Sequence, residues 1–177
     1  MKNNSTTLLF LAGAFVLFVI VKILPKFKSA PTHTTGRIEQ ADDLKSNYSF
    51  KQDGSAWIIS DGGDTLSEIK IEIASTLSQI DTGLKYRKTL KTNNGLLFIF
   101  ETMEHQSFWM KNTFIPLDLL MMDQNGIIIQ INEGMKPKSV EPINSSSPIK
   151  YALEVNKGFV ANNQIRKGSK LTFEKNK

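Results

Sequence analysis

The stretch that decides the fold is FWMKNTFIPLD, Phe108 to Asp118, which sets a cation, an amide and a carboxylate among large apolar side chains. It runs directly into the apolar segment 119–122, a pattern typical of a buried strand. An unpaired charge that folding removes from water costs a large part of the marginal stability of a small domain. Lys111, Asn112 and Asp118 must therefore either bond to protein partners or line a ligand site. The sequence leaves both interpretations open.

An apolar run, LLFLAGAFVLFVIV at residues 8–21, lies close to the N-terminus. Extended from Ser5 to Leu24, it reaches the roughly 20 residues that a helix needs to cross a bilayer. The triplet Lys28-Ser29-Ala30 places lysine where a signal-peptide cleavage site needs a small residue. The sequence therefore predicts an uncleaved membrane anchor over residues 1–28 rather than a cleaved signal.

Two features of the N-terminus favour opposite orientations in the membrane. Lys22, Lys26 and Lys28 outnumber Lys2 and the α-amine, and the positive-inside rule would then keep the following domain in the cytoplasm. The short start resembles an ordinary export signal, which favours the other orientation. We expect the domain on the extracytoplasmic side, in the cell envelope or periplasm, joined to the anchor by a polar tether at residues 29–46.

Charge and composition narrow the function classes. Four of the 22 lysines and arginines precede Ala30 and all 17 acidic residues follow it, which leaves 18 basic against 17 acidic side chains. The basic excess is juxtamembrane, where lysines suit anionic lipid headgroups, so we expect no nucleic-acid partner. The chain has no cysteine and only two histidines, His33 and His105. We expect no disulfide, no metal site and no cofactor, and a surface position for His105.

Residues 47–177 carry turn signals at the spacing of short strands. The strands predicted from alternation or apolar runs are residues 48–51, 56–60, 69–73, 96–100, 119–122, 127–132, 151–155 and 171–173. Ser75 or Thr76 is expected to cap a short helix, residues 158–164 to form a helical turn, and Gly134 to Pro148 to form a long surface loop. This pattern predicts one mainly β domain, sandwich or barrel-like, with one or two short helices. A parallel α/β sheet is the alternative.

Five segments of the chain, taken in order, resemble the DUF192 family. They are IEIA at residues 71–74, GLKYR at 83–87, GLLFIF at 95–100, FWMKNT with IPLD at 108–118, and YALEV at 151–155. The resemblance runs from about Glu68 to Phe173, and the Trp-Met-Lys-Asn-Thr core followed by Ile-Pro-Leu-Asp is its most specific part. It implies a small, often exported or membrane-tethered domain with a β-sandwich-like fold and no established activity. Some members carry cysteines in the loop that residues 137–148 form here, so a redox role would not extend to this cysteine-free chain.

Charged and aromatic residues extend the candidate site. Arg87 follows the predicted helix, and its planar guanidinium suits a carboxylate from Asp118, Glu72, Glu154 or a ligand. Asp118 is expected to be partly buried, in a structural or a ligand-facing role. Glu72 and Glu154 lie on the polar phase of their strands, which indicates either a solvated face or, if the strands adjoin, paired carboxylates for acid and base roles. Trp109 is expected in the core or as a ligand platform.

Two functions from different classes fit these residues. The first is a membrane-tethered extracytoplasmic binding or accessory module that contacts a small polar ligand or an envelope protein. Its predicted ligand cluster consists of Glu72, Arg87, Trp109, Lys111, Asn112, Asp118 and Glu154. The second is a carboxylate-dependent hydrolase acting on a cell-envelope substrate, which has less support because no nucleophile elbow, metal-ligand set or histidine pair accompanies the carboxylates. Alternatively, the polar cluster only stabilises the fold.

Overall fold

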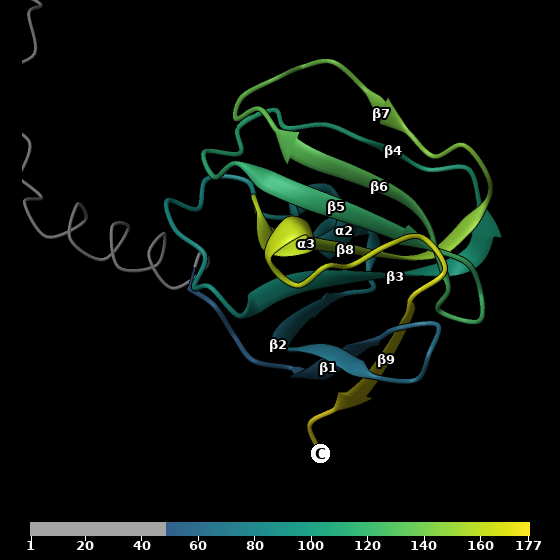
Figure 1. Cartoon of the computed structure of the whole chain (residues 1–177). Helices are drawn as coiled ribbons and strands as arrows, with labels where there is room; N and C mark the ends of the chain where they lie inside the picture. The colour runs from purple at the N-terminus through teal and green to yellow at the C-terminus, as the bar shows by residue number, and fades with distance from the viewer. Residues whose placement is uncertain (1–48) are drawn as a thin grey trace, which may run out of the picture. The chain divides into compact units, whose positions relative to one another are not determined.

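The computed structural model describes residues 49–177, which form a mainly β domain with two short helices (Figure 1). The predicted membrane anchor and tether, residues 1–46, lie outside the described residues. No helix within residues 49–177 has the length and apolar character to cross a membrane. The elements in chain order are β1 (Gly54–Ile59), β2 (Thr65–Ala74), α2 (Leu77–Thr82), β3 (Asn94–Glu104), β4 (Ser107–Phe108), β5 (Leu117–Met122), β6 (Ile128–Met135), β7 (Ile143–Asn144), β8 (Ile149–Asn156), α3 (Phe159–Asn162) and β9 (Lys170–Lys175).

One seven-stranded sheet organises the domain, in the order β6-β5-β8-β3-β2-β1-β9. Its neighbouring strands run antiparallel except β2 and β3, which α2 connects and which run parallel. The two outer strands approach each other at one end, where Ile127 forms a bridge with Lys170. There the Ile128 N–H donates to the Ser169 carbonyl at 2.8 Å. The sheet therefore curls toward a barrel, and this contact shields part of its two edges.

Gly126 makes this edge contact sterically possible. The residue has a φ of +79°, and a Cβ placed on it would lie 2.4 Å from the carbonyl oxygen of Leu171. The Leu171 N–H in turn donates to the Gly126 carbonyl at 2.8 Å. Gly126 also belongs to the turn between β5 and β6, so the hairpin that Asn125-Gly126 predicts is confirmed.

Each face of the sheet carries its own apolar layer, because successive strand residues point to opposite sides. One layer packs against α3 and contains Ile69, Ile71, Leu97, Leu120, Met122, Leu153 and Val155, together with Phe159 and Val160. The other contains Ala74, Leu96, Phe98, Phe100, Leu117, Leu119, Met121 and Ala152, and Ile80, Phe108 and Ile143 of α2, β4 and β7 pack against it. Figure 1 shows α3 in front of the sheet and α2 behind it.

Local side-chain chemistry sets the ends of α2. Thr76 caps its first turn, where the Gln79 N–H donates to the Thr76 hydroxyl at 3.3 Å and the Thr76 N–H donates to the Gln79 side-chain carbonyl at 3.1 Å. This reciprocal pair is a capping box. Gly83, at φ +52°, ends the helix. The predicted helix and its cap at Thr76 are confirmed.

Two predictions of local structure are wrong. The strand predicted at residues 48–51 does not form over its described residues 49–51, because the Lys51 N–H donates to a carboxylate oxygen of Glu72 at 2.6 Å instead of joining a ladder. The surface loop predicted from Gly134 to Pro148 is shorter, since β6 continues to Met135 and residues 143–144 form β7. Met135 still pairs with Leu117 of β5, so backbone pairing extends this strand through a polar stretch that sequence alternation does not mark.

Candidate functional site

Strand register places two buried glutamates on one face of the sheet. Leu96 of β3 pairs with Glu72 of β2 on one side and with Glu154 of β8 on the other. Directly paired residues point to the same side, so both carboxylates lie on the face that α2 covers. Each residue is only 6% exposed. Of the two alternatives that the sequence leaves open for these glutamates, the solvated face is wrong, because α2 and its flanking residues lie over them. Their strands do not adjoin, since β3 lies between β2 and β8.

The protein itself compensates the charge of Glu72. Its carboxylate accepts hydrogen bonds from the Arg87 guanidinium and from the Lys51 N–H, and the side chains of Glu72 and Arg87 are both almost fully buried. Of the partners that the sequence allows for Arg87, the structure selects Glu72. The pair lines a depression of about 640 Å³, here called the polar groove, together with Ser49, Phe50, Lys51, Asp53, Ile73, Ala74, Ser78, Gln79, Thr82, Gly83 and Leu96.

Glu154 lacks comparable compensation. Within residues 49–177 it has no hydrogen bond or ion pair, although the charge of Arg87 is close enough to act on it. Burial raises the pKa of its carboxyl to about 7, and Arg87 offsets only part of that rise. A largely buried carboxyl that receives no hydrogen bond from the protein and opens into a cavity is a candidate for ligand contact.

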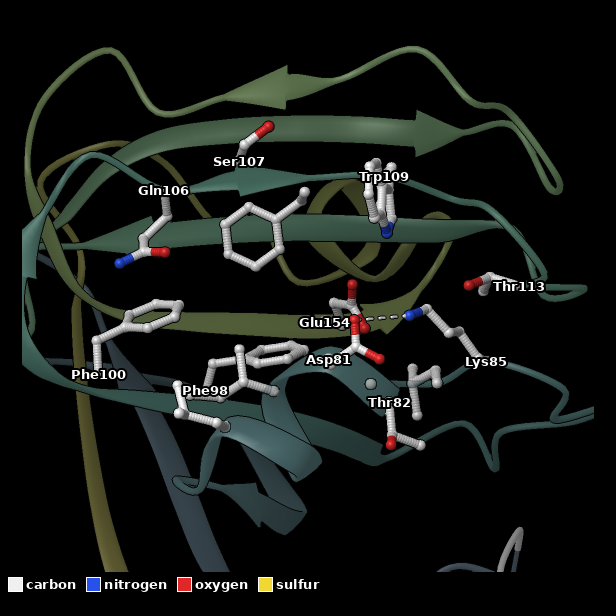
Figure 2. A pocket seen from close by; sticks show the side chains of 15 residues that line it. Asp81, Thr82, Lys85, Phe98, Phe100, Gln106, Ser107, Trp109, Thr113 and Glu154 are labelled. Atoms are coloured by element: carbon white, nitrogen blue, oxygen red, sulfur yellow. Dashed lines mark hydrogen bonds and ion pairs between the residues drawn. The ribbon is translucent and has the colours of Figure 1, made fainter.

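The Glu154 carboxyl opens into a second cavity, here called the aromatic pocket, which has a volume of about 310 Å³. Its other lining residues are Leu77, Ile80, Asp81, Thr82, Gly83, Leu84, Lys85, Phe98, Phe100, Gln106, Ser107, Phe108, Trp109 and Thr113. Figure 2 shows Phe98 and Phe100 at one end, and Glu154, Asp81 and Lys85 toward the other. The pocket thus has an apolar half and a charged half.

Aromatic rings give the apolar half a defined shape. Phe108 stands edge-on to Phe98 and Phe100, with ring centroids 5.6 and 6.2 Å away, whereas Phe98 and Phe100 stack 6.4 Å apart. Trp109, which also lines the pocket, is 51% exposed, whereas its neighbour Met110 is buried at 1%. Trp109 therefore belongs to the wall of the pocket rather than to the core.

Lys111 and Asn112 lie in an adjoining cavity of about 360 Å³, here called the lysine pocket, which also includes Lys85, Tyr86 and Trp109. Adjacent residues on a straight strand would point to opposite sides, but Asn112 has a left-handed φ of 61° and turns the chain. The Asn112 side-chain amide donates to the Tyr86 hydroxyl at 2.9 Å, and the Tyr86 N–H donates to the Asn112 carbonyl at 2.8 Å.

Asp118 lies on the opposite face of the sheet from Glu154. It is fully buried, and its carboxylate accepts backbone N–H groups from Gly134 at 2.8 Å, Gly158 at 2.9 Å and Val160 at 3.2 Å. These bonds tie the end of β6 and the start of α3 to β5. Asp118 thus has the structural role of the two that the sequence leaves open, and a ligand on the α2 face does not meet it.

The structure therefore divides the single cluster that the sequence predicts. Trp109 and Glu154 share the aromatic pocket, Lys111 and Asn112 share the lysine pocket with Trp109, and Glu72 and Arg87 line the polar groove. His105 contributes a ring nitrogen 3.2 Å from the Ser145 carbonyl and lines none of these cavities. Across residues 49–177, no three side chains of the metal-ligating types gather at one point.

Sequence reasoning missed the residues that form most of the aromatic pocket. Phe98 and Phe100 belong to the predicted strand 96–100, and their i, i+2 spacing places both rings on one side of it. Asp81 and Lys85, an i, i+4 pair joined at 3.2 Å, lie on and just after α2. Their spacing is visible in the sequence, but only the fold shows that α2 brings them to Glu154.

Comparisons with known proteins place the chain in a family. Residues 58–173 match the family profile of DUF192, whose description reads "Uncharacterized ACR". The chain belongs to the DUF192 family. A solved structure from Sinorhizobium meliloti 1021, of a protein proposed to be a transcription regulator, is 32% identical, covers 71% of this chain and 98% of its own, and has a TM-score of 0.67.

A second similar solved structure, from Novosphingobium aromaticivorans DSM 12444, is of a protein of unknown function. It is 26% identical, covers 67% of this chain and 83% of its own, and has a TM-score of 0.63. No curated protein matches the chain. The comparisons thus confirm the resemblance and give the family without an activity.

Proposed function

We propose that this DUF192 domain is a membrane-tethered, extracytoplasmic binding module whose ligand occupies the aromatic pocket. The observation that carries the proposal is the Glu154 carboxyl, which is buried at the pocket without a hydrogen-bond donor from residues 49–177. Burial of a polar group costs free energy unless a partner satisfies it. A bound ligand would supply the missing donor, and the hydrogen bond would contribute to the affinity of the ligand.

The form of the aromatic pocket supports this proposal. Its volume of about 310 Å³ suits a small molecule or one inserted side chain, at the lower end of the range for ligand sites. Apolar walls with a few converging polar groups are typical of such sites. The exposed Trp109 at the rim adds a flat amphipathic surface, which is the kind of residue that contributes most to binding.

The runner-up function is a carboxylate-dependent hydrolase acting on a cell-envelope substrate. One observation favours it: a carboxyl with a pKa of about 7, as burial gives Glu154, suits a general acid at neutral pH. The pair formed by Glu72 and Glu154 gives it little support, because the Glu72 carboxylate is bound to Arg87 and lines the polar groove instead. A transcription-regulator role, as proposed for the Sinorhizobium protein, has little support from the nearly balanced charge after Ala30.

The binding function is tested by a small-molecule thermal-shift screen on the purified full-length chain and on Glu154→Gln. We expect ligands whose stabilisation of the wild-type chain is lost in Glu154→Gln. Glu68→Gln is the matched control, since Glu68 is an exposed glutamate on β2 and lines none of the three cavities. It removes the same charge and should leave every shift unchanged.

Two results would contradict the binding function. If every ligand of the wild-type chain stabilises Glu154→Gln equally, the aromatic pocket is not the binding site. Steady release of product from envelope glycans or peptides, abolished in Glu154→Gln, would replace the binding module by the hydrolase. Trp109→Ala gives an independent measure, because loss of this wall should weaken binding of the same ligands several-fold.

The proposed location rests on the N-terminal sequence alone. The apolar run at residues 8–21 and the polar segment at residues 29–46 support an anchor and a tether. A reporter enzyme that is active only after export, fused after Lys177, should be active in cells. Activity confined to a cytoplasmic reporter at the same position would reverse the proposed orientation.

A further inference from the structure

The charges around the aromatic pocket are unevenly compensated. Asp81 and Lys85 bond to each other at 3.2 Å, so the single cation that lines the pocket is already engaged. Arg87 pairs with Glu72 and lines the polar groove rather than the aromatic pocket. This leaves Glu154 as the unneutralised group of the cavity, and it can only accept hydrogen bonds once ionised.

The aromatic walls of the pocket also favour a ligand with positive charge. Phe98, Phe100, Phe108 and Trp109 all line the same cavity. The face of an aromatic ring carries partial negative charge and attracts a cation held within about 6 Å of its centre. Acidic and aromatic groups therefore favour the same sign of ligand charge, and an anion would meet the uncompensated carboxylate.

We propose that the ligand of the aromatic pocket is an organic ammonium ion with a compact apolar body. Its N–H groups donate to the Glu154 carboxylate, and its apolar body packs against Phe98, Phe100 and Phe108. The proposal rests on the binding function proposed above and adds the chemical class of the ligand. The ammonium group belongs either to a free amine or to a lysine side chain of a partner, since both present the same chemistry.

A cationic ligand has a further consequence for Glu154 that a neutral hydrogen-bond donor lacks. A positive charge next to the carboxyl stabilises its ionised form and lowers its pKa from about 7. Binding near pH 6 must therefore release a proton, and affinity should rise from pH 6 to pH 8. The other charged groups that face Glu154, namely Asp81, Lys85 and Arg87 with its partner Glu72, already form ion pairs with one another.

The experiment is isothermal titration calorimetry of the full-length chain with three probes of one shape: benzylamine, benzyl alcohol and benzoate. We expect benzylamine to bind at least about tenfold more tightly than benzyl alcohol, which corresponds to about 1.4 kcal/mol. Benzoate should not bind. Glu154→Gln should lose at least about tenfold in benzylamine affinity, and Glu68→Gln should keep the wild-type value.

Titrations at pH 6 in two buffers with different enthalpies of ionisation measure the released proton directly. We expect release with benzylamine and none with benzyl alcohol. Nα-acetyl-lysine amide serves as a fourth probe. If it binds more tightly than benzylamine, a partner's lysine side chain is the source of the ammonium group, and the reverse order identifies a free amine.

The outcomes separate this inference from the binding function. Equal or tighter binding of benzyl alcohol, or benzylamine binding that Glu154→Gln leaves unchanged, overturns the ammonium ligand. The binding function would survive that result if the thermal-shift screen yields neutral or acidic ligands whose stabilisation depends on Glu154. If neither the probes nor the screen give any such ligand, both proposals fall.

Discussion

Asp118 and Glu154 are both buried carboxylates on neighbouring strands of one sheet, yet they lie in opposite environments. Asp118 faces the α3 side and accepts three backbone N–H groups, whereas Glu154 faces the α2 side and has no donor from residues 49–177. The first therefore contributes to the fold and the second opposes it. Burial alone therefore does not distinguish a structural carboxylate from one in a ligand site. The number of hydrogen bonds that the protein donates to each carboxylate does distinguish them.

Removing the Asp118 carboxylate should have the largest effect. Asp118→Ala leaves three backbone N–H groups buried without a partner, and we expect a loss of about 5 kcal/mol in the free energy of unfolding. Thermal denaturation should show a fall in Tm of roughly 15 °C for a domain of this size. Asp118→Asn keeps one acceptor oxygen and should lose less. A fall of only a few degrees for Asp118→Ala would remove the structural role and with it the contrast to Glu154.

The buried Glu72–Arg87 ion pair is intermediate between Asp118 and Glu154, because one cation compensates the carboxylate. Arg87→Met leaves the buried Glu72 carboxylate without its cation, and we expect a loss of about 4 kcal/mol on chemical denaturation. The double substitution Glu72→Met with Arg87→Met should recover most of this loss, because an apolar pair leaves no buried charge. Failure of the double variant to recover would mean that Arg87 stabilises the domain by contacts other than the pair.

Arg87→Met also sharpens the comparison at Glu154. The positive charge of Arg87 lowers the pKa of Glu154, so its loss should raise that pKa above about 7. A carbon-13 NMR titration of the glutamate side-chain carboxyl carbons measures this shift in the full-length chain. An unchanged titration would show that Arg87 does not act on Glu154.

The last predicted effect is a gain in stability, from the substitution Glu154→Gln. The pKa of the Glu154 carboxyl is about 7 in the folded chain against 4.5 ordinarily, so the folded state binds more protons between these values. Stability must then fall as pH rises from 4.5 to 7, by about 3 kcal/mol from this group. Glu154→Gln removes this loss and should be more stable than the wild-type chain at pH 8 but not at pH 4.5. Glu68→Gln should follow the wild-type curve.

Much of the fold can be predicted from the sequence because local patterns encode it. The Thr76 cap, the Asn125-Gly126 turn and the apolar strand 96–100 depend on short-range chemistry, and the structure confirms each one. The absence of the predicted strand at residues 49–51 depends instead on a hydrogen bond from the Lys51 N–H to Glu72, which is far away in sequence. The alternation of apolar and polar residues in the sequence does not indicate such a long-range contact.

The site is predictable only in part for the same reason. The sequence identifies Trp109 and Glu154 as candidates, and the structure brings both to one cavity. It cannot assign Asp118 to the other face from Glu154, because that follows from the register Asp118–Val155, which only the assembled sheet fixes. Nor can it supply Asp81 and Lys85, which reach the cavity only through the α2 connection between two parallel strands.

Thr82 and Gly83 line both the aromatic pocket and the polar groove. The end of α2 thus separates the polar groove, where Arg87 compensates Glu72, from the aromatic pocket, where Glu154 is uncompensated. A Cβ at Gly83 would stand 3.6 Å from the ring of Phe98, at a φ of +52° that side chains rarely adopt. A displacement of this segment would therefore change the volume of both cavities.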